Sequence, residues 1–157
     1  MEENKAREQS LDLMKTSPAA YLSTIDEHGF PQIRAMVNLR NSEQYPSVVE
    51  LFNGHDRDLL VYISTNTTSN KARQIRANPK VAVYYCIPEH WRGLMLGGEA
   101  ETLEEIELKR KIYQKGWEIY FPEGPGDPDF ALFRLMPVVA KYYQSLDVCD
   151  FGFEGER

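Results

Sequence analysis

The chain is short of cysteine and has no long apolar run. Its two cysteines, Cys86 and Cys149, form no Cys-x-x-Cys pair and are too few for a disulfide framework or a zinc site. No apolar run approaches the roughly 20 residues that span a bilayer, and residues 1–10 lack the apolar core of a signal peptide. These absences predict a cytoplasmic protein with reduced thiols and no membrane contact.

An excess of positive charge is also missing. Acidic residues outnumber basic ones by 24 to 18, which leaves a formal net charge of −6. Because non-specific nucleic-acid binding needs a basic surface, the sequence predicts no nucleic-acid partner. A chain of 157 residues that is 42% hydrophobic can bury one core. We therefore expect a single domain over residues 1–157.

The common catalytic and nucleotide-binding signatures are absent. There is no GxxxxGK[ST] loop, no GxGxxG after a strand and no GxSxG elbow, which argues against triphosphate chemistry, a dinucleotide fold and serine hydrolysis. The histidines, His28, His55 and His90, stand apart in predicted loops without the spacing of metal ligands. Since no set of acid, base and nucleophile is evident, a bound cofactor would have to carry any reaction.

The most informative stretch is LLVYISTNTTSNKARQIRANPKVAVYYC, residues 59–86. Alternating residues predict a strand over 59–63 and a second strand that ends at Cys86. Between them, six hydroxyl and amide side chains, residues 64–69, are too polar for the core and predict a turn with a helix N-cap. A short helix over 70–77 then ends before Asn78-Pro79.

The start of that helix is a candidate anion site. A helix N-terminus offers unpaired N–H groups and a partial positive charge, and Lys71, Arg73 and Arg76 stand beside it. With the neighbouring hydroxyls, this composition predicts a phosphate site. The alternative interpretation is an ordinary capped helix with a solvated basic face.

A predicted hairpin earlier in the chain is the second candidate. Strands over 19–25 and 31–39 are joined by a turn at 26–29. The second strand places Gln32, Arg34, Met36 and Asn38 on one face and Ile33, Ala35, Val37 and Leu39 on the other. A face with arginine, asparagine and methionine is not ordinary core, so it either meets solvent or forms a ligand wall.

The remaining segments predict a mainly β fold with peripheral helices. We expect helices over 3–16 and 102–117, the latter the longest, and strands over 94–103, 130–136 and 138–144. The last two strands could be one long bent strand across Pro137, and residues 48–52 form either a short helix or an extra strand. Residues 1–17 hold the N-terminal helix, and the tail, 145–157, is expected to pack loosely.

These elements sum to about seven strands and three helices. Short turns between consecutive strands favour an antiparallel sheet, and small antiparallel sheets commonly close to remove their edges. The predicted architecture is a small antiparallel β-barrel. Gly97-Gly98 inside a strand indicates a bulge, a barrel corner or a close backbone approach.

Large side chains gather at the predicted strand ends. Trp91, Arg92, Tyr142 and Tyr143 either pack in the core or a dimer contact, or flank a flat aromatic ligand.

With these residues assembled, the chain resembles the FMN-binding split-barrel superfamily of pyridoxamine 5′-phosphate oxidase, and within it the smaller general-stress-protein branch. The resemblance follows family order from about residue 10 to 145. Its marks are Arg34-Ala35-Met36-Val37, Ile63-Ser64-Thr65 with Ser69-Asn70-Lys71, Ile75 with Asn78-Pro79 and Val81-Ala82-Val83-Tyr84, Leu96-Gly97-Gly98-Glu99-Ala100, and Tyr120-Phe121-Pro122.

The resemblance implies a homodimer with FMN at the subunit interface. It assigns the flavin and ribityl chain to Arg34, Ala35, Met36 and Val37. It assigns the phosphate to Thr65, Ser69 and Lys71, with Ser64 and Asn70 nearby. It also implies that Trp91 and Arg92 approach the cofactor from the partner subunit.

Three departures from the family pattern narrow the function. Asn70 stands where the oxidases tend to carry arginine, and Gly93 where a flavin-contacting glutamine is common. The tail after Tyr143 lacks the tryptophan and arginine residues that the oxidases use around their substrate. These departures argue against oxidation of pyridoxamine phosphate itself.

Three options for the function remain open at the level of sequence. The first is a flavin-dependent oxidoreductase acting on an unknown small molecule, with a nicotinamide or related electron donor. The second is a non-catalytic flavin-binding or stress-response module. A third option is a split barrel that binds haem, a deazaflavin or no cofactor.

Overall fold

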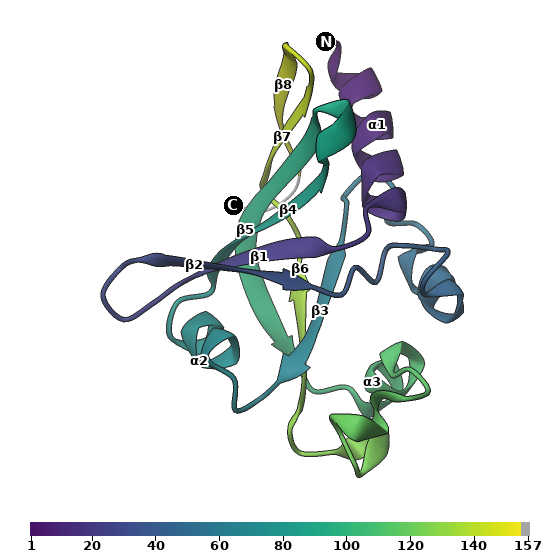
Figure 1. Ribbon diagram of the computed structural model, residues 1–157, viewed down its shortest axis with the longest axis vertical. Coiled ribbons are helices and arrows are strands. Elements are labelled where there is room, and N and C mark those ends of the chain that lie inside the picture. The colour runs from purple at the N-terminus through teal and green to yellow at the C-terminus, as the bar shows by residue number, and fades with distance from the viewer. Residues whose placement is uncertain (155–157) are drawn as a thin grey trace.

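Alternating buried and exposed residues, separated by short turns, form an eight-stranded antiparallel sheet in the computed structural model, which describes residues 1–154 (Figure 1). The strands are β1 (Ala20–Ile25), β2 (Pro31–Met36), β3 (Val61–Asn66), β4 (Lys80–Ile87), β5 (Arg92–Leu103), β6 (Phe130–Leu135), β7 (Val139–Gln144) and β8 (Asp147–Gly152). The helices are α1 (Glu3–Thr16), α2 (Asn70–Ala77) and α3 (Ile106–Ile112). Short 3₁₀ turns cover Pro46–Phe52, Pro88–His90, Trp117–Ile119 and Gly124–Gly126.

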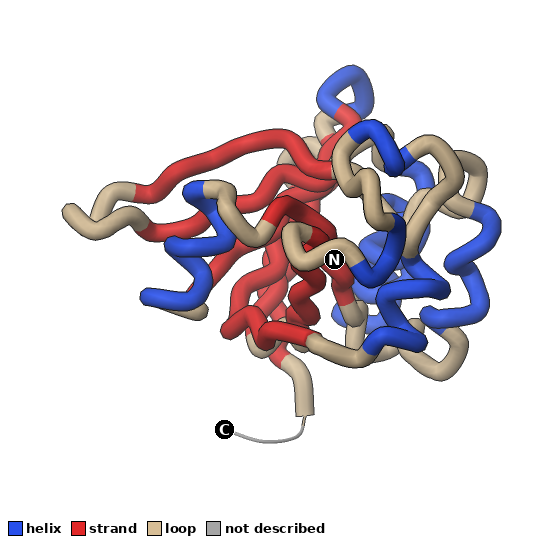
Figure 2. The backbone as a smooth tube through the Cα atoms, turned by 90° about the horizontal axis from the view of Figure 1, so that it is seen from below, coloured by secondary structure: helices blue, strands red, loops and turns tan. Residues whose placement is uncertain are grey.

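The strand order makes the barrel a split one. Neighbouring strands follow the path β2-β1-β4-β5-β6-β3, with β7 added beside β5 and β8 beside β7. β2 and β3 are the two ends of this path, and no hydrogen-bonded ladder joins them in the described part of the chain. Figure 2 shows the strands curving around one another while most helical segments gather on one side. The predicted small antiparallel split β-barrel is thus confirmed.

The paired glycines of β5 lie where another segment of backbone comes close. β5 pairs with β7 through Gly97 and then with β6 from Ala100 onward. A Cβ on Gly98 would lie 3.1 Å from the carbonyl oxygen of Met136 and 3.4 Å from the Cα of Pro137. Of the predicted explanations, the close backbone approach is therefore the one observed here.

The main core lies between the sheet and α1. The face predicted for α1, with Ala6, Ser10, Leu13 and Met14, is fully buried. It packs against the inward side chains of the central strands, which include Leu94, Leu96 and Tyr142. A second, smaller cluster gathers around α3 and the 46–52 turn, with Phe52, Ile112 and Phe130. The N-terminal helix thereby covers one open side of the barrel.

The predicted helix over 102–117 is wrong. β5 extends through Leu103 because Thr102 and Leu103 pair with Phe133 and Leu132 of β6. α3 covers only Ile106–Ile112, and α1 is the longest helix of the described chain. Long-range pairing overrides the local helical charge pattern at this point.

The C-terminal tail is not loosely packed over its first part. Residues 147–152 form β8, which pairs along its whole length with β7, and Phe151 is buried in the main core. This strand brings the number to eight instead of about seven. Residues 155–157, the end of the predicted tail, lie outside the described residues.

Two further boundaries differ from expectation. Ser64 and Thr65 belong to β3 and are buried, because β3 pairs with β6 along Val61–Asn66; the prediction that they are too polar for the core is wrong. The observed strand therefore starts two residues later and ends three residues later than the predicted strand over 59–63. Residues 48–52 are part of a 3₁₀ turn, and 130–144 form two strands, the first of the two options.

Candidate functional site

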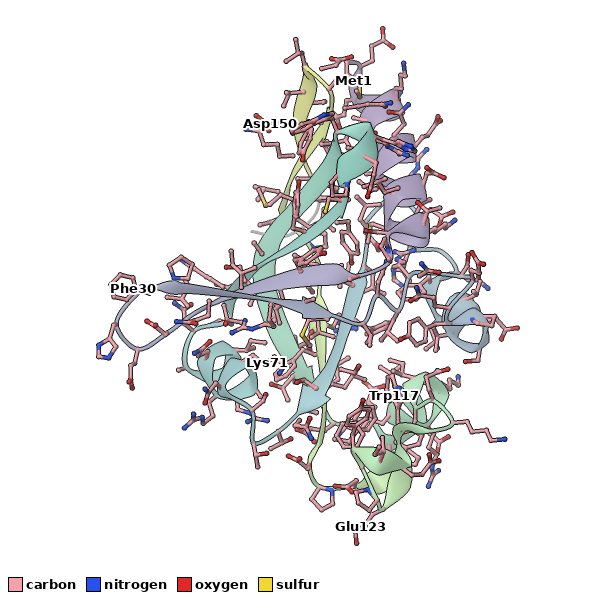
Figure 3. All side chains as sticks on the ribbon, in the orientation of Figure 1. Met1, Phe30, Lys71, Trp117, Glu123 and Asp150 are labelled. Atoms are coloured by element: carbon pink, nitrogen blue, oxygen red, sulfur yellow. The ribbon has the colours of Figure 1, made fainter. Side chains whose placement is uncertain are left out.

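Two basic side chains lie near each other beside β2, the strand at one end of the sheet. Arg34 is on β2, and Lys71 is in the first turn of α2, below the β1–β2 hairpin in Figure 3. Burial lowers the pKa of both groups, and the charge of Arg34 lowers the pKa of Lys71 further. Within residues 1–154, neither group is paired with a carboxylate. A bound anion would relieve their mutual repulsion.

Contacts from two elements hold Arg34 in place. Its Nη1 donates to Thr24 Oγ1 at 2.7 Å and to the Leu22 carbonyl at 3.3 Å, both on β1. Its Nη2 donates to Gln74 Oε1 of α2 at 3.4 Å. Arg34 and Met36 are half-buried on the inward face of β2, so this face is not fully open to solvent. That it forms a ligand wall stays a prediction. Asn38, next on the same face, is buried and donates to the carbonyls of Met14 and Ser17.

The opposite face of β2 points away from the core. Ala35 pairs with Tyr21 and is exposed, and Val37 is exposed as well. Strand alternation therefore divides the four residues 34–37 that the resemblance assigned to the flavin. Met36, Val37 and Ile63, the residue before Ser64, nevertheless line one small cavity.

The N-terminus of α2 is capped as predicted. Ser69 Oγ accepts from the Ala72 N–H at 3.3 Å and donates to the Asn66 carbonyl at 2.7 Å. The hydroxyl is thus committed to the cap, and the N–H groups of Asn70 and Lys71 belong to the unpaired first turn. The Asn70 side chain accepts from Arg73 on the exposed side of the helix.

The turn before α2 is braced by Asp129, a residue the sequence reasoning missed. Its carboxylate accepts from Asn66 Nδ2 at 2.7 Å and from the N–H and hydroxyl of Thr68 at 3.0 Å. Its carbonyl accepts from the Thr67 N–H at 2.8 Å. The hydrogen bond from Asn66, with those from Thr68 and Thr67, holds the pKa of Asp129 below its usual value. The Asp127-Pro128-Asp129 sequence before a strand was the available signal.

Arg40, an arginine that the sequence reasoning missed, lies beyond the C-terminal end of β2. Arg40 is 4% exposed, and its guanidinium stacks on Phe52 at 4.2 Å. Its Nε donates to the Leu60 carbonyl at 3.0 Å and its Nη2 to the His55 carbonyl at 2.8 Å. Its Nη1 is buried and has no hydrogen-bond partner.

Arg40 lines a cavity of about 10 Å³ between the end of β2 and β3. This is about the space that one water molecule needs. The cavity is lined by Met36, Val37, Arg40, Tyr62, Ile63 and Tyr85, among others.

Trp91 and Arg92 lie away from this cluster. Trp91 is 72% exposed in the turn between β4 and β5, with a φ of 46°. Arg92 donates to Tyr142 Oη at 3.1 Å and to the Gln9 carbonyl and Asp12 Oδ2 at 3.2 Å. Arg92 thus fixes α1 to the sheet within one chain. Contacts of either residue with a partner's cofactor stay a prediction.

The outward face of the sheet carries exposed apolar side chains together with charged residues, Lys80 beside Glu99 and Lys141 beside Asp150. Cross-strand pairs place Ile33, Ser23, Ala82, Gly97 and Val139 in one row on this face. Ile33 is 71% exposed and Val139 49%. We call this surface, with Ala35 and Val148, the outer sheet face.

A tyrosine pair lies on the same face. The hydroxyls of Tyr84 and Tyr143 are hydrogen-bonded to each other, and burial is the main cause that raises the pKa of Tyr84. Gly93 pairs with Tyr143 across the ladder, and a Cβ at this position would collide with the Tyr143 ring and the Tyr84 hydroxyl. The glycine therefore makes room for the pair.

Comparisons with known proteins agree with the fold described above. The family model described as pyridoxamine 5′-phosphate oxidase matches residues 6–144. A pyridoxine/pyridoxamine 5′-phosphate oxidase from Escherichia coli (strain SMS-3-5 / SECEC) is 29% identical over 108 residues, which are 68% of this chain and 43% of that protein. The chain thus spans less than half the length of this curated relative.

Solved structures share the whole fold. A protein from Clostridium acetobutylicum related to general stress protein 26 matches with a TM-score of 0.76 and 28% identity, over 96% of each chain. A heme binding protein from Mycobacterium smegmatis matches with a TM-score of 0.68 and 13% identity, over 94% of this chain and 57% of that one. The second likeness shows the fold alone. With a family model that covers most of its length, the chain belongs to the pyridoxamine 5′-phosphate oxidase family.

Proposed function

We propose that this chain is a flavoprotein that binds FMN at the split between β2 and β3. The observation that carries the proposal is the Arg34–Lys71 pair, two half-buried cations with no acid partner within residues 1–154. A phosphate dianion would compensate both charges and accept from the N–H groups of the first turn of α2. Membership of the family favours a flavin as the rest of the ligand.

The residues present fit the two ends of such a ligand. Lys71, Arg34 and the helix end supply donors for a phosphate. Met36, which is half-buried, and Val37, which is exposed, supply apolar side chains next to Arg34, as a flat ring system requires. Bound FMN would supply the electron transfer, while the chain's own residues bind it, orient it and shape its electrostatics.

We further propose that the protein is a homodimer in which the outer sheet face is the contact. Its apolar side chains Ile33, Val139 and Val148 are all about half exposed or more in the single chain, and apolar side chains that gather exposed on one face favour a binding partner. A second copy would bury it and bring the cofactor, bound at the edge of β2 next to this face, to the subunit interface. Trp91 and Arg92 would then be near the partner's cofactor.

We propose flavin-dependent oxidation or reduction of a small molecule as the reaction, with a nicotinamide as electron donor. The alternative, a flavin-binding module of the stress response, is supported by the full-length likeness to a protein related to general stress protein 26. Pyridoxamine-phosphate oxidation is not proposed, because Asn70 and Gly93 depart from the pattern of the oxidases. The two free cysteines fit a cytoplasmic location, and no helix in residues 1–154 is long and apolar enough to cross a membrane.

Titration of the purified protein with FMN tests the cofactor. Saturable binding with a perturbed flavin spectrum, weakened in the Arg34→Ala/Lys71→Ala variant, supports the proposal. Parallel titrations with haem and a deazaflavin identify the other flat cofactors. A protein that ignores FMN but binds one of these contradicts the FMN proposal.

Anaerobic mixing of the FMN-loaded protein with NADH or NADPH separates enzyme from module. Loss of the flavin colour on mixing, and its return when a small-molecule acceptor is added, support an oxidoreductase if both repeat over many cycles. FMN that stays oxidised with both donors supports the binding module.

A further inference from the structure

A cavity of about 160 Å³ lies where β5 ends, between α2 and α3. The two helices flank the end of β5 on opposite sides in Figure 1. Because a cavity of roughly 150 Å³ in a protein can hold a benzene ring, this one has room for a ligand of that size. Its lining combines apolar and cationic side chains, which restricts the kind of ligand that fits.

The apolar part of the lining comes from two paired strands. Leu103 at the end of β5 and Phe130, Ala131 and Leu132 at the start of β6 line the cavity, and all four are buried. Leu103 and Leu132 lie side by side because they pair across the ladder between the strands. This part of the cavity therefore favours the apolar body of a ligand.

Two cations line the same cavity, one from each helix. Arg76 of α2 donates to the Thr67 carbonyl at 3.0 Å, and Lys109 of α3 donates to the Phe130 carbonyl at 3.0 Å. Since Thr67 and Phe130 are lining residues themselves, both cationic groups are held at the cavity wall. A guanidinium has five N–H donors and an ammonium group has three, so each side chain keeps donors for a ligand.

The charges around this cavity do not balance. Glu104 is also a lining residue, but its carboxylate lies 3.7 Å from Lys109 Nζ, and its side chain is 82% exposed. Within residues 1–154, Arg76 has no carboxylate within 4 Å. Two cations against one solvated carboxylate leave a local excess of positive charge in a chain whose net charge is −6. This excess fits an anionic group on the ligand.

The cavity is separate from the proposed FMN site. On α2, Gln74 contacts Arg34 and lies on the same flank of the helix as Lys71. Arg76 lies on the other side of the buried Ile75, as the helical spacing requires. Neither Arg34 nor Lys71 lines the cavity. A ligand can therefore bind here whether or not FMN binds beside β2.

We propose that the cavity between α2 and α3 binds a small organic carboxylate whose apolar body is about the size of a phenyl ring. The body lies against Leu103 and Leu132, and the carboxylate accepts hydrogen bonds from Arg76 and Lys109. Inorganic phosphate has no apolar body to cover the two leucines, and a neutral ring leaves both cations without a counter-charge. Both parts of the ligand are therefore required.

Titration of the isotope-labelled protein with benzoate, followed by nuclear magnetic resonance, tests the site. We expect saturable shifts of the backbone amide signals of Thr102, Leu103 and Ala131. Benzyl alcohol, a neutral ligand of the same size, and inorganic phosphate should each bind at least tenfold more weakly at these amides. The absence of saturable shifts with benzoate, or equal binding of either of the other two ligands, overturns the proposal.

Arg76→Gln/Lys109→Gln removes both cations and should weaken benzoate binding at least tenfold. The matched control is Arg73→Gln/Arg110→Gln, which removes one exposed arginine from each of the same two helices, outside the cavity. This control should keep the wild-type affinity for benzoate. Equal losses in the two double variants would mean that the total charge of the surface attracts benzoate, and would overturn the proposal.

Thr102→Trp keeps both charges and fills the space instead. Thr102 lines the cavity and is exposed, so a larger side chain there leaves the core unchanged. We expect at least a tenfold loss of benzoate affinity with little change in the urea unfolding midpoint. Undiminished binding by Thr102→Trp, or wild-type shifts that centre on Lys71 and Gln74, overturns the proposal. If Arg76→Gln/Lys109→Gln does not fold, Thr102→Trp and the comparison with benzyl alcohol decide.

Discussion

At the scale of single residues, the candidate site depends on a few charges that have no acid partner within residues 1–154. Lys71 is the clearest of them, because burial and Arg34 both disfavour its charged form. A ligand with a phosphate restores the balance, whereas the same ligand without phosphate does not. Comparison of FMN with riboflavin therefore isolates this end of the site.

We predict that Lys71→Ala weakens FMN binding by about 2 kcal/mol, the typical contribution of a hydrogen bond to a charged group, or roughly 30-fold. Riboflavin affinity should change far less. The control is Arg73→Ala, which removes an exposed arginine on the same helix that bonds to Asn70. Equal losses for FMN and riboflavin would show that Lys71 does not contact the phosphate.

Gly93 is a second position at which a change in one residue has a testable effect: a single added carbon atom should lower the stability of the fold. A methyl group there collides with the Tyr143 ring and the Tyr84 hydroxyl, so Gly93→Ala should lower the free energy of unfolding by about 1–3 kcal/mol through overpacking. The double variant Gly93→Ala/Tyr143→Ala removes the obstacle. Urea unfolding should show a double variant less destabilised than the sum of its single variants; strict additivity would rule out the clash.

At the scale of elements, the turn before α2 is held by a loop that lies far away in the sequence. Asp129 links that turn to the start of β6 through hydrogen bonds that favour its charged form. Because its pKa is lowered on folding, its contribution is fully present above its unfolded pKa of about 4 and is lost as the pH falls through the lower, folded value.

We therefore predict that Asp129→Asn destabilises the protein at pH 6 and that the gap to the wild type narrows at pH 3. Urea unfolding at the two pH values measures both differences. The exposed Asp56→Asn variant provides a reference for general charge effects. A gap that is the same at both pH values would mean that the Asp129 carboxylate gains nothing from its partners in the folded state.

At the scale of the whole molecule, the homodimer proposal rests on the outer sheet face. We predict that Ile33→Glu, which places a charge on this face, converts the dimer to a monomer in sedimentation velocity experiments. FMN affinity should fall with it if the cofactor lies at the interface. Val49→Glu, in the 46–52 turn, is a comparably exposed control outside the face. A wild-type protein that sediments as a monomer contradicts the homodimer proposal.

The sequence by itself determined the elements that depend on local chemistry. Ser69 caps α2 because a hydroxyl before a helix can accept from an N–H three residues on, and the buried face of α1 follows from its helical spacing. The ordered motifs from Arg34 to Pro122 indicated the family and its split barrel. They also assigned Arg34 to the flavin and ribityl chain and Lys71 to the phosphate of one cofactor; the two side chains lie near each other, and their binding of a cofactor stays a prediction.

Only the tertiary structure decided the features that depend on distant partners. Pairing with β6 extended β5 through Leu103 and buried Ser64 and Thr65, and pairing with β7 ordered β8. The roles of Asp129 and Arg40 arise in the same way, because their partners lie 61 to 63 and 15 to 20 residues away along the chain. Local patterns carry no information on such contacts, since hydrogen-bonding strands and burying a charge are properties of the assembled fold.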